Sequence, residues 1–333
     1  MSTMNDVAKR AGVSTMTVSR VINNAGYISA ETRQRVERAI AELDYVPNAL
    51  ARSLRHKQTH TLALILTDIT NPFFTTIARG VEDTASQYGF SVIFCNTDES
   101  QDKEGEYLNI LVQRRVDGIL FVPASTSADS ITFLQERHTT VVVLDRRLSD
   151  MKVDCVRCDA EEGAYQLTQH LLELGHKDIA ILSGPQTVST AIDRVRGYER
   201  AFVEAGRKHQ PGLYGTFTRH GGYEMAQRAL ALKPRPTAFV ATNNFIAVGA
   251  FQAIREAGLR VPEDISLVSF DDLSAALVME PFLTAVDQPA YEMGQRATAL
   301  LLSRLSGQTI GAPQEVILPT RLIVRKSSAP PHR

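Results

Sequence analysis

Short apolar runs alternate with amphipathic stretches from Thr61 through most of this 333-residue chain, and this alternation constrains the fold more than any other feature. The runs have the length of strands, whereas stretches such as Ile77–Tyr88 and Phe245–Ala257 repeat apolar residues at helical spacing. Alternation of strand and helix is typical of parallel sheets with helices on both faces, so we predict an α/β body. The expected strands are Thr61–Thr67, Phe90–Asn96, Val116–Pro123, Thr140–Asp145, Ile179–Gly184, Ala238–Thr242, Ser266–Asp271 and Leu283–Asp287.

The body holds more strands than one sheet accommodates easily. Roughly ten strands over about 270 residues fit two doubly wound parallel-sheet subdomains better than a single sheet. We place the body at residues 61–333, with an N-subdomain at about 61–159 and 289–320 and a C-subdomain at about 160–288 and 321–333. The chain is then expected to cross between the subdomains near Asp159, Gln288 and Thr320.

Residues 1–46 have a different pattern, which predicts an all-α domain. Thr3 and Asp6 form a helix start signal, and Gly12 is expected to end that helix. Ser14 is placed to cap a second helix, in which Val18, Val21 and Ile22 recur at helical spacing, and Ser29 is placed to cap a third.

The outward face of the second helix indicates DNA binding. It carries side chains that can meet base edges and phosphates, and three helices of this size form a helix-turn-helix unit whose second helix enters the major groove. The alternative is a three-helix segment that only packs against the body, but such a segment has no need for this cluster. The outward residues are Thr15, Met16, Ser19, Arg20 and Asn23.

The distribution of charge supports the same interpretation. The chain has a net charge of −1, but residues 1–60 hold nine Lys or Arg against five Asp or Glu, which gives +4, and the remainder is −5. A basic head on an acidic body is typical of a small DNA-binding module attached to a larger domain. Residues 47–60 are predicted to be a linker whose segment Pro47–Arg55 is too short to form a stable helix alone.

The remaining composition excludes several classes of protein. No apolar run reaches the ~18 residues of a membrane span, and the N-terminus lacks the apolar stretch of a signal peptide, so we expect a cytoplasmic protein. Cys155 and Cys158 lie in a further strand-like stretch, Val153–Asp159, and have the spacing of half a zinc site or a redox pair, but no second Cys pair or suitable His pair accompanies them. We therefore expect reduced thiols, no metal, no cofactor and no catalytic residues.

Polar side chains stand just beyond the ends of many expected strands. In doubly wound sheets, ligands bind outside the carboxyl ends of the strands. Carboxylates, amides and an arginine offer paired donors and acceptors, and nearby aromatic rings cover apolar faces, which together suit a polyhydroxylated ligand. The polar residues are Asp68, Asn71, Asp145, Arg146, Asn243, Asp271 and Gln288, and the rings are Phe73, Phe74 and Phe217.

Several motifs along nearly the whole chain resemble the lactose/galactose repressor family. They are Asn5-Asp6-Val7-Ala8-Lys9-Arg10-Ala11-Gly12-Val13-Ser14, Thr17-Val18-Ser19-Arg20-Val21-Ile22-Asn23, Ala51-Arg52-Ser53-Leu54, Asn71-Pro72-Phe73-Phe74, Val116-Asp117-Gly118-Ile119, Leu174-Gly175-His176 and Val261-Pro262-Glu263-Asp264-Ile265-Ser266. The resemblance implies a homodimer, sometimes a tetramer, that binds a pseudo-palindromic operator. It also implies a small effector held between two subdomains similar to periplasmic binding proteins.

The resemblance assigns roles to residues of the head and linker. Thr15, Met16 and Arg20 are expected to read bases, with Arg20 suited to guanine. Leu54 matches the wedge that enters the minor groove and kinks the duplex. Ser14, Thr17 and Asn23 are expected to contact phosphates or cap helices, and Asn48, Ala51 and Arg52 to contact DNA from the hinge.

The effector pocket resembles the ribose-binding type more than the purine type. The matching residues are Asn71, Phe73, Phe74, Asp145, Arg146, Arg194, Phe217, Asn243, Asp271 and Gln288. Arg194 is expected either to clamp hydroxyls or to pair with Asp145. Asn244 departs from the pattern, since many relatives carry Asp there. A pentose or related monosaccharide is the expected effector, while two arginines leave a sugar acid or a phosphorylated sugar open.

These inferences predict a transcriptional repressor whose DNA affinity is controlled by a small sugar. Within the same class, the ligand could act instead as a corepressor, or a partner protein such as a phosphorylated carrier protein could be the effector. A plain sugar carrier is disfavoured by the basic head. An enzyme is disfavoured because the sequence holds no nucleophile elbow, phosphate loop or metal-spaced cluster.

Overall fold

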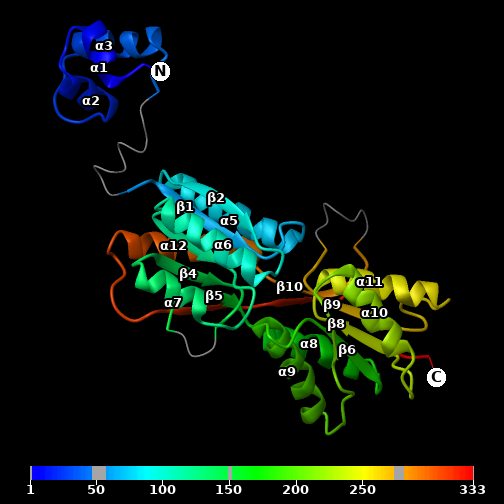
Figure 1. The fold of residues 1–333 in the computed structure, drawn as a ribbon. Helices are drawn as coiled ribbons and strands as arrows, with labels where there is room; N and C mark the ends of the chain where they lie inside the picture. Colours follow the sequence, from blue (N-terminus) through cyan, green and yellow to red (C-terminus); the bar gives the residue numbers. More distant parts are fainter. Residues whose placement is uncertain (1, 47–57, 149–151, 274–280, 333) are drawn as a thin grey trace. The chain divides into compact units, whose positions relative to one another are not determined.

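The computed structural model describes residues 2–46, 58–148, 152–273 and 281–332. By its internal contacts the chain divides into two compact units, a head at Met1–Thr59 and a body at His60–Arg333 (Figure 1). No helix among the described residues is long and apolar enough to span a membrane.

The head contains the three predicted helices, α1 (Met4–Ala11), α2 (Thr15–Ile22) and α3 (Ala30–Glu42). Their ends follow the predicted signals. Thr3 accepts the Asp6 N–H at 3.3 Å, and the Asp6 carboxylate accepts the Thr3 N–H at 2.9 Å. Gly12 ends α1 with φ of +63°, a conformation that glycine adopts without steric cost. Ser14 and Ser29 each cap their helix through a side-chain oxygen.

One apolar cluster holds the head together. Val7, Val18, Val21 and Val36 come from all three helices and are almost completely buried, and Tyr45 closes the cluster after α3. The predicted apolar faces of the three helices therefore meet in one small core, which leaves the opposite face of α2 exposed.

The body consists of two parallel sheets with helices on both faces, as predicted. Within the described residues the first sheet has the order β11-β5-β4-β3-β1-β2 and the second β12-β10-β9-β8-β6-β7. Neighbouring strands in the described residues pair in parallel, except that β10 and β12 are antiparallel. The first sheet comprises β1 (Thr61–Leu66), β2 (Ser91–Asn96), β3 (Gly118–Phe121), β4 (Thr140–Leu144), β5 (Asp154–Cys158) and β11 (Glu315–Leu318). The second comprises β6 (Ile179–Ser183), β7 (Leu213–Tyr214), β8 (Ala238–Ala241), β9 (Ser266–Phe270), β10 (Thr284–Asp287) and β12 (Arg321–Ile323).

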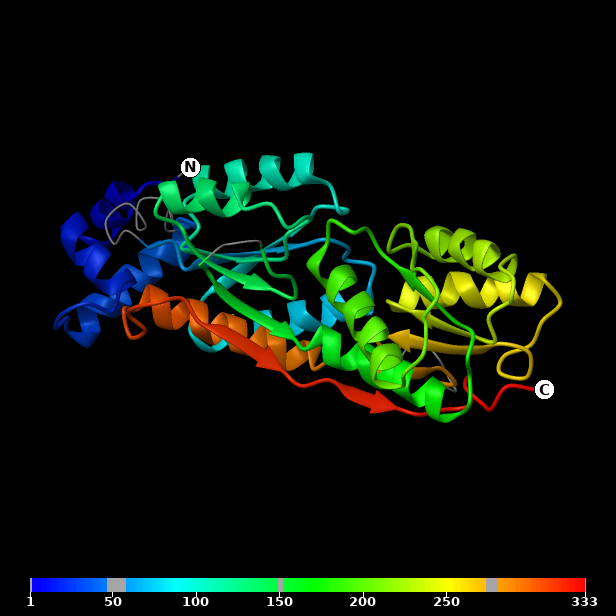
Figure 2. The same cartoon turned by 90° about the horizontal axis from the view of Figure 1, so that it is seen from below.

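Each sheet is covered by two pairs of helices, as Figure 2 shows from a second direction. The first sheet lies between the pair α5 (Pro72–Gln87) and α12 (Ala290–Leu305) and the pair α6 (Gln101–Gln113) and α7 (Asp129–Glu136). The second lies between the pair α8 (Ala160–Glu173) and α9 (Ser189–Glu204) and the pair α10 (Arg219–Leu230) and α11 (Asn244–Glu256).

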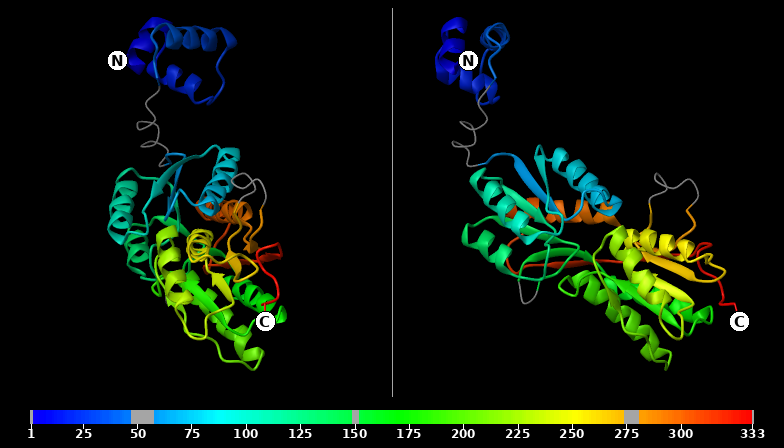
Figure 3. Two further views of the ribbon diagram at one scale, coloured as in Figure 1. Left: turned by 90° about the vertical axis from the view of Figure 1, so that its right-hand side faces the viewer. Right: turned by 45° about the vertical axis from the view of Figure 1, so that its right-hand side comes forward.

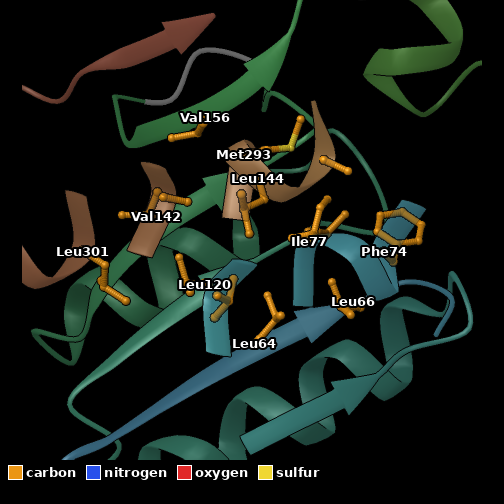
Figure 4. Close-up of a cluster of buried hydrophobic side chains, with 14 of the residues drawn as sticks. Leu64, Leu66, Phe74, Ile77, Leu120, Val142, Leu144, Val156, Met293 and Leu301 are labelled. Carbon is orange, nitrogen blue, oxygen red and sulfur yellow. The ribbon is translucent and has the colours of Figure 1, made fainter. Parts of the chain in front are cut away.

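The strands alternate their side chains between the two helical layers. Leu64 and Leu66 of β1 point to the cluster that contains Ile77 and Met293 (Figure 4), whereas Ile65 belongs to the cluster on the other face. Because both faces are buried, central strands such as β1 and β8 are apolar along nearly their whole length. This double burial explains why the strands read as continuous apolar runs in the sequence.

The chain passes between the two sheets three times. The crossings follow β5, β10 and β11, so that α12 packs on the first sheet although it comes after most of the second. Figure 3 shows the two sheets as separate lobes joined by these connections. Two lobes joined only by a few chain connections are an arrangement in which hinge motion between the lobes is common.

Three strands were not predicted from the sequence: β7, β11 and β12. Each lies at the edge of its sheet, and β7 has only two residues. In β11, Glu315 and Ile317 are exposed while Leu318 is buried. An edge strand with one exposed face lacks the continuous apolar run that identifies a central strand, which is why the sequence pattern did not reveal these three.

Candidate functional site

The exposed face of α2 is the first candidate site. Thr15, Met16 and Arg20 are exposed, Met16 with 65% of its surface accessible. The neighbouring Ser14 is used locally, because its Oγ accepts the Thr17 N–H at 3.2 Å and lies 3.0 Å from the Thr17 hydroxyl. Ser14 therefore has a capping role, whereas Thr15, Met16 and Arg20, which were expected to read bases, are exposed and make no side-chain hydrogen bond within the described part of the chain.

Asn23 also has a structural role in the head. It ends α2, and its Nδ2 donates to the Ser19 carbonyl at 2.8 Å and to the Ser19 Oγ at 3.3 Å. Thr17 is only half-buried and stays close to the surface. The predicted hinge contacts Asn48, Ala51, Arg52 and Leu54 lie outside the described residues.

The second candidate site is a cavity of about 410 Å³ in the body. It lies where the carboxyl ends of strands from both sheets meet, because its lining follows β1, β2, β4, β6, β8 and β9. Of the ten predicted pocket residues, nine line this cavity, and the tenth, Gln288, donates a short hydrogen bond to Asp271. The lining residues are Thr67, Asp68, Thr70, Asn71, Phe73, Phe74, Asp98, Glu99, Asp145, Arg146, Pro185, Thr190, Arg194, Thr216, Phe217, Thr218, Asn243 and Asp271.

The start of α5 places an amide and two rings on the wall. Asn71 caps the helix by accepting the Phe73 N–H at 3.0 Å, and Pro72 occupies the first turn, where its missing N–H costs nothing. The rings of Phe73 and Phe74 meet edge-to-face with 5.1 Å between centroids. The N-P-F-F motif is therefore a local device that orients three of the pocket residues.

Asp145 and Asp271 occupy equivalent positions in the two lobes. Each follows a buried strand, has a positive φ (63° and 66°), and donates its N–H to a neighbouring strand at 2.9 and 3.0 Å, respectively. Burial raises the pKa of both carboxyls, that of Asp271 to about 6, although the positive charge of Arg194 opposes the rise. Non-glycine residues with positive φ are uncommon, and a pair of them at one cavity indicates a constrained site.

Arg146 is held by Glu99, a residue that sequence reasoning missed. Its two terminal nitrogens each donate to a Glu99 carboxylate oxygen at 2.6 Å, and Nη1 also donates to the Pro123 carbonyl at 2.8 Å. Burial lowers the pKa of Arg146, but the charge and hydrogen bonds of Glu99, together with the charges of Asp145 and Glu104, leave the pKa raised. The signal available in the sequence was the position of Glu99 just beyond β2.

Arg194 is buried as well, but no carboxylate among the described residues lies within ion-pair distance of it. Its Nη1 donates to the Thr242 carbonyl at 2.6 Å, and its guanidinium lies 3.8 Å from the centroid of the Phe270 ring. The pairing of Arg194 with Asp145 that the sequence left open is therefore not formed. Asp145 instead forms an ion pair with Arg146 Nε at 3.8 Å, and Arg194 lowers its pKa from beyond ion-pair distance.

Two asparagines connect the lobes at the cavity. Asn71 Nδ2 donates to Asn244 Oδ1 at 3.3 Å, and Asn244 Nδ2 donates to Asn71 Oδ1 at 3.0 Å. Asn243 instead caps α11 by accepting the Ile246 N–H at 2.8 Å. Asn244 therefore supplies a neutral cross-lobe contact.

Four buried polar atoms on or beside the wall have no hydrogen-bond partner among the described residues: Thr67 Oγ1, Arg146 Nε, Arg194 Nε and Gln288 Oε1. Buried polar groups in proteins are nearly always satisfied. A concentration of unpaired donors and acceptors at one cavity therefore favours a polar ligand over an apolar one.

The three cysteines are free and buried, and burial raises the pKa of Cys155 to about 12. No group of three or more His, Cys, Asp or Glu in the described part of the chain is arranged to hold a metal ion. The C-x-x-C spacing thus reflects packing along β5.

Two family models match the chain. Residues 3–48 match the bacterial regulatory proteins of the lacI family, and residues 59–326 match the periplasmic binding proteins and sugar binding domain of the LacI family. The chain belongs to the LacI family of bacterial regulatory proteins. This LacI-family regulator accordingly combines a helix-turn-helix head with a body of the periplasmic-binding-protein fold, and its family is one of transcriptional regulators, not of enzymes.

Individual relatives are similar over their whole length. The HTH-type transcriptional repressor PurR of Pasteurella multocida is 39% identical over 331 residues, which cover 98% of both chains. The ribose operon repressor of Escherichia coli is 38% identical over 333 residues, which cover 99% of this chain and 100% of that one. A crystal structure of the lac repressor dimer bound to operator and the anti-inducer ONPF is 29% identical, with a TM-score of 0.87 over 98% and 99% of the two chains.

Proposed function

We propose that this regulator is a repressor whose affinity for its operator is controlled by a neutral pentose, with D-ribose the first candidate. The observation that carries the proposal is the set of unsatisfied buried polar atoms around a cavity lined by carboxylates, amides and aromatic rings. Sugar hydroxyls both donate and accept, so one pentose can satisfy carboxylates and guanidinium groups together.

The size and composition of the cavity support a monosaccharide. A volume of about 410 Å³ lies near the lower end of the range for small-molecule sites. The rings of Phe73 and Phe217 come from opposite lobes and can cover the apolar faces of a sugar ring. Since Arg146 is already paired with Glu99, the wall carries more negative than positive charge, which favours a neutral ligand over a sugar acid.

On the DNA side, we propose that Arg20 donates to a guanine in the major groove and that Thr15 and Met16 set the preferred operator. The resemblance adds Leu54 as a minor-groove wedge and the other hinge residues as DNA contacts. The lac repressor is described as a dimer, and we propose a homodimer here too, which acts in the cytoplasm. Two exposed apolar side chains fit such a contact: Tyr88 at the end of α5, with 63% of its surface accessible, and Phe94 in the edge strand β2, with 42%.

We propose that the cavity and the DNA-binding head are coupled through closure of the two lobes around the ligand. A sugar that contacts both lobes stabilises the closed arrangement, and a tenfold change in operator affinity requires about 1.4 kcal/mol of differential binding. We propose release by the sugar. If the sugar were a corepressor, the same contacts would increase operator affinity instead of lowering it. If a partner protein were the effector, operator affinity would not depend on a sugar.

Calorimetry on the full-length chain tests the ligand. D-Ribose is titrated first, followed by other pentoses, hexoses and purine bases, because the pocket was expected to resemble the ribose-binding type of this fold rather than the purine-binding type. The proposal predicts saturable binding of D-ribose at micromolar to millimolar concentrations and none of the purines. Binding of a purine without any sugar would overturn it.

Selection of duplexes from a random pool by the full-length chain tests the DNA-binding role. We expect a pseudo-palindromic sequence with two half-sites, read at fixed salt because phosphate contacts make affinity strongly salt-dependent. Arg20→Ala should remove the sequence preference, whereas Arg38→Ala on the exposed surface of α3 serves as a charge-matched control. Enrichment of no sequence would contradict the proposal.

A further inference from the structure

We propose that Glu99 determines the specificity of the cavity by occupying Arg146, so that ligands with a carboxylate or phosphate are excluded. The inference rests on the proposed function, because it concerns which class of sugar the same cavity accepts. It follows from the contacts of Glu99, from the turn that holds it, and from the charges around Arg146.

The contact between Glu99 and Arg146 has the two-point geometry with which arginine binds anions. Both terminal nitrogens donate at 2.6 Å, and the Arg146 side chain is only 4% exposed. A ligand carboxylate or phosphate would use these same two nitrogens. Glu99 therefore stands where an anionic group of a ligand would bind, and it lines the cavity itself.

The turn after β2 holds Glu99 in this place. Asp98 and Glu99 both have positive φ, 52° and 59°, in succession. The Asp98 carboxylate accepts from Lys103 Nζ at 2.5 Å and from Asn96 Nδ2 at 2.6 Å, and Ser100 then caps α6. Strained backbone of this kind persists where its surroundings fix it, so the position of Glu99 is set by the fold.

Other acids around Arg146 balance its positive charge, so this guanidinium offers no net charge to a ligand. Asp145 lies 3.8 Å from the guanidinium Nε. Glu104 is a third negative group near Arg146; it is buried and accepts the Ala124 N–H at 2.8 Å and the Ser130 hydroxyl. An incoming anion thus meets three carboxylates around one guanidinium, whereas a neutral hydroxyl meets only acceptors and the free Nε.

The test compares neutral and anionic probes by calorimetry on the full-length chain. The probes are D-ribose, D-ribonate and inorganic phosphate, and the variants are Glu99→Gln and, as a matched control, Asp102→Asn, which removes an exposed acid from α6. Glu99→Gln should increase the affinity for D-ribonate or phosphate at least about tenfold, because the arginine donors become available, and should change D-ribose affinity much less. Asp102→Asn should leave both unchanged.

The outcomes separate this inference from the proposed function. If the wild-type chain does not bind D-ribose but Glu99→Gln gains phosphate affinity, the pentose assignment fails and the role of Glu99 stands. If D-ribose binds and a folded Glu99→Gln gains no affinity for either anion, the role of Glu99 is overturned. Circular dichroism checks folding. If Glu99→Gln does not fold, Glu99→Asp replaces it, because this variant keeps the charge but shortens the side chain. A smaller gain in affinity for D-ribonate or phosphate is then expected, and no gain at all would overturn the role of Glu99.

Discussion

Each lobe of the body contributes one wall of the cavity with one buried arginine, but the two arginines have different neighbours. Arg146, from the first lobe, is bound at both terminal nitrogens by Glu99. Arg194, from the second, has a carbonyl and an aromatic ring as neighbours and no carboxylate within ion-pair distance in the described residues. A buried arginine with a protein carboxylate stabilises the fold, whereas one without keeps donors for a ligand.

The carboxylates follow the same division. Asp145 lies beside Arg146 at 3.8 Å, whereas Asp271 is bonded to neutral Gln288. The backbone around these two acids is nearly the same in both lobes, so the difference comes from the neighbouring side chains. The arginine of the first lobe is therefore paired within the protein, whereas the arginine of the second lobe keeps donors for a ligand.

Removal of Arg146 should have the largest effect, and it should act on stability. Arg146→Ala leaves Glu99 without its cation and removes one of the two arginines near buried Asp145, and loss of one partner of a buried pair costs about 3 kcal/mol or more. Urea unfolding of the body measures the change. Arg79→Ala, which removes an exposed ion pair with Asp83, should cost less than about 0.5 kcal/mol. Equal losses of stability in both variants would mean that the buried pair of Arg146 contributes no more than a surface ion pair, which would contradict its structural role.

Removal of Arg194 should act mainly on the ligand. Arg194→Ala deletes the donors that lack a protein carboxylate, and D-ribose affinity should fall about 100-fold, which corresponds to about 2.7 kcal/mol. Arg196→Ala on the same helix, where the side chain is 58% exposed, is the control and should bind normally. Calorimetry measures both. Unchanged affinity in Arg194→Ala would assign the ligand to another part of the cavity.

The amide pair that joins the two walls should have an intermediate effect. Asn244→Ala leaves the amide of Asn71 without its cross-lobe partner, and an unsatisfied buried amide costs about 1–3 kcal/mol. Urea unfolding gives the cost. Asn109→Ala, on the exposed face of α6, should be nearly neutral. If Asn244→Ala is as stable as the control, the pair does not hold the lobes together.

The smallest predicted effect concerns pH. Burial raises the pKa of Asp271 to about 6, so its ionised form destabilises the ligand-free fold above that pH, and the penalty disappears as the pH falls toward the ordinary value. Sugar hydroxyls donate to the ionised form, so D-ribose affinity should fall about tenfold between pH 7 and pH 5. Calorimetry at several pH values measures this. Asp271→Asn should bind more weakly but with a flatter profile, and an equally steep profile would assign the titration to another group.

The sequence predicted the central strands, because double burial makes them continuously apolar, and it predicted the polar residues at their ends. The structure brings Asn71, Asp145, Asn243 and Asp271 around one cavity, as the strand-end rule requires. Edge strands such as β11 were missed because one face is exposed.

The pairing of Glu99 with Arg146 could not be predicted, because it joins residues 47 positions apart and depends on the turn after β2. Sequence reasoning therefore counted two arginines available to a ligand where the structure leaves one. Thr190 was also missed, although it lies one helical turn before Arg194 on α9, and that spacing was a usable signal.

The most direct test of the account is whether the cavity controls DNA binding. Fluorescence anisotropy at fixed salt measures the affinity of the full-length chain for its selected duplex, with and without saturating D-ribose, for the wild type and for Arg194→Ala. The account predicts that D-ribose weakens specific binding at least about tenfold in the wild type and not in Arg194→Ala. Equal operator affinity with and without D-ribose in a wild-type chain that binds the sugar would contradict it.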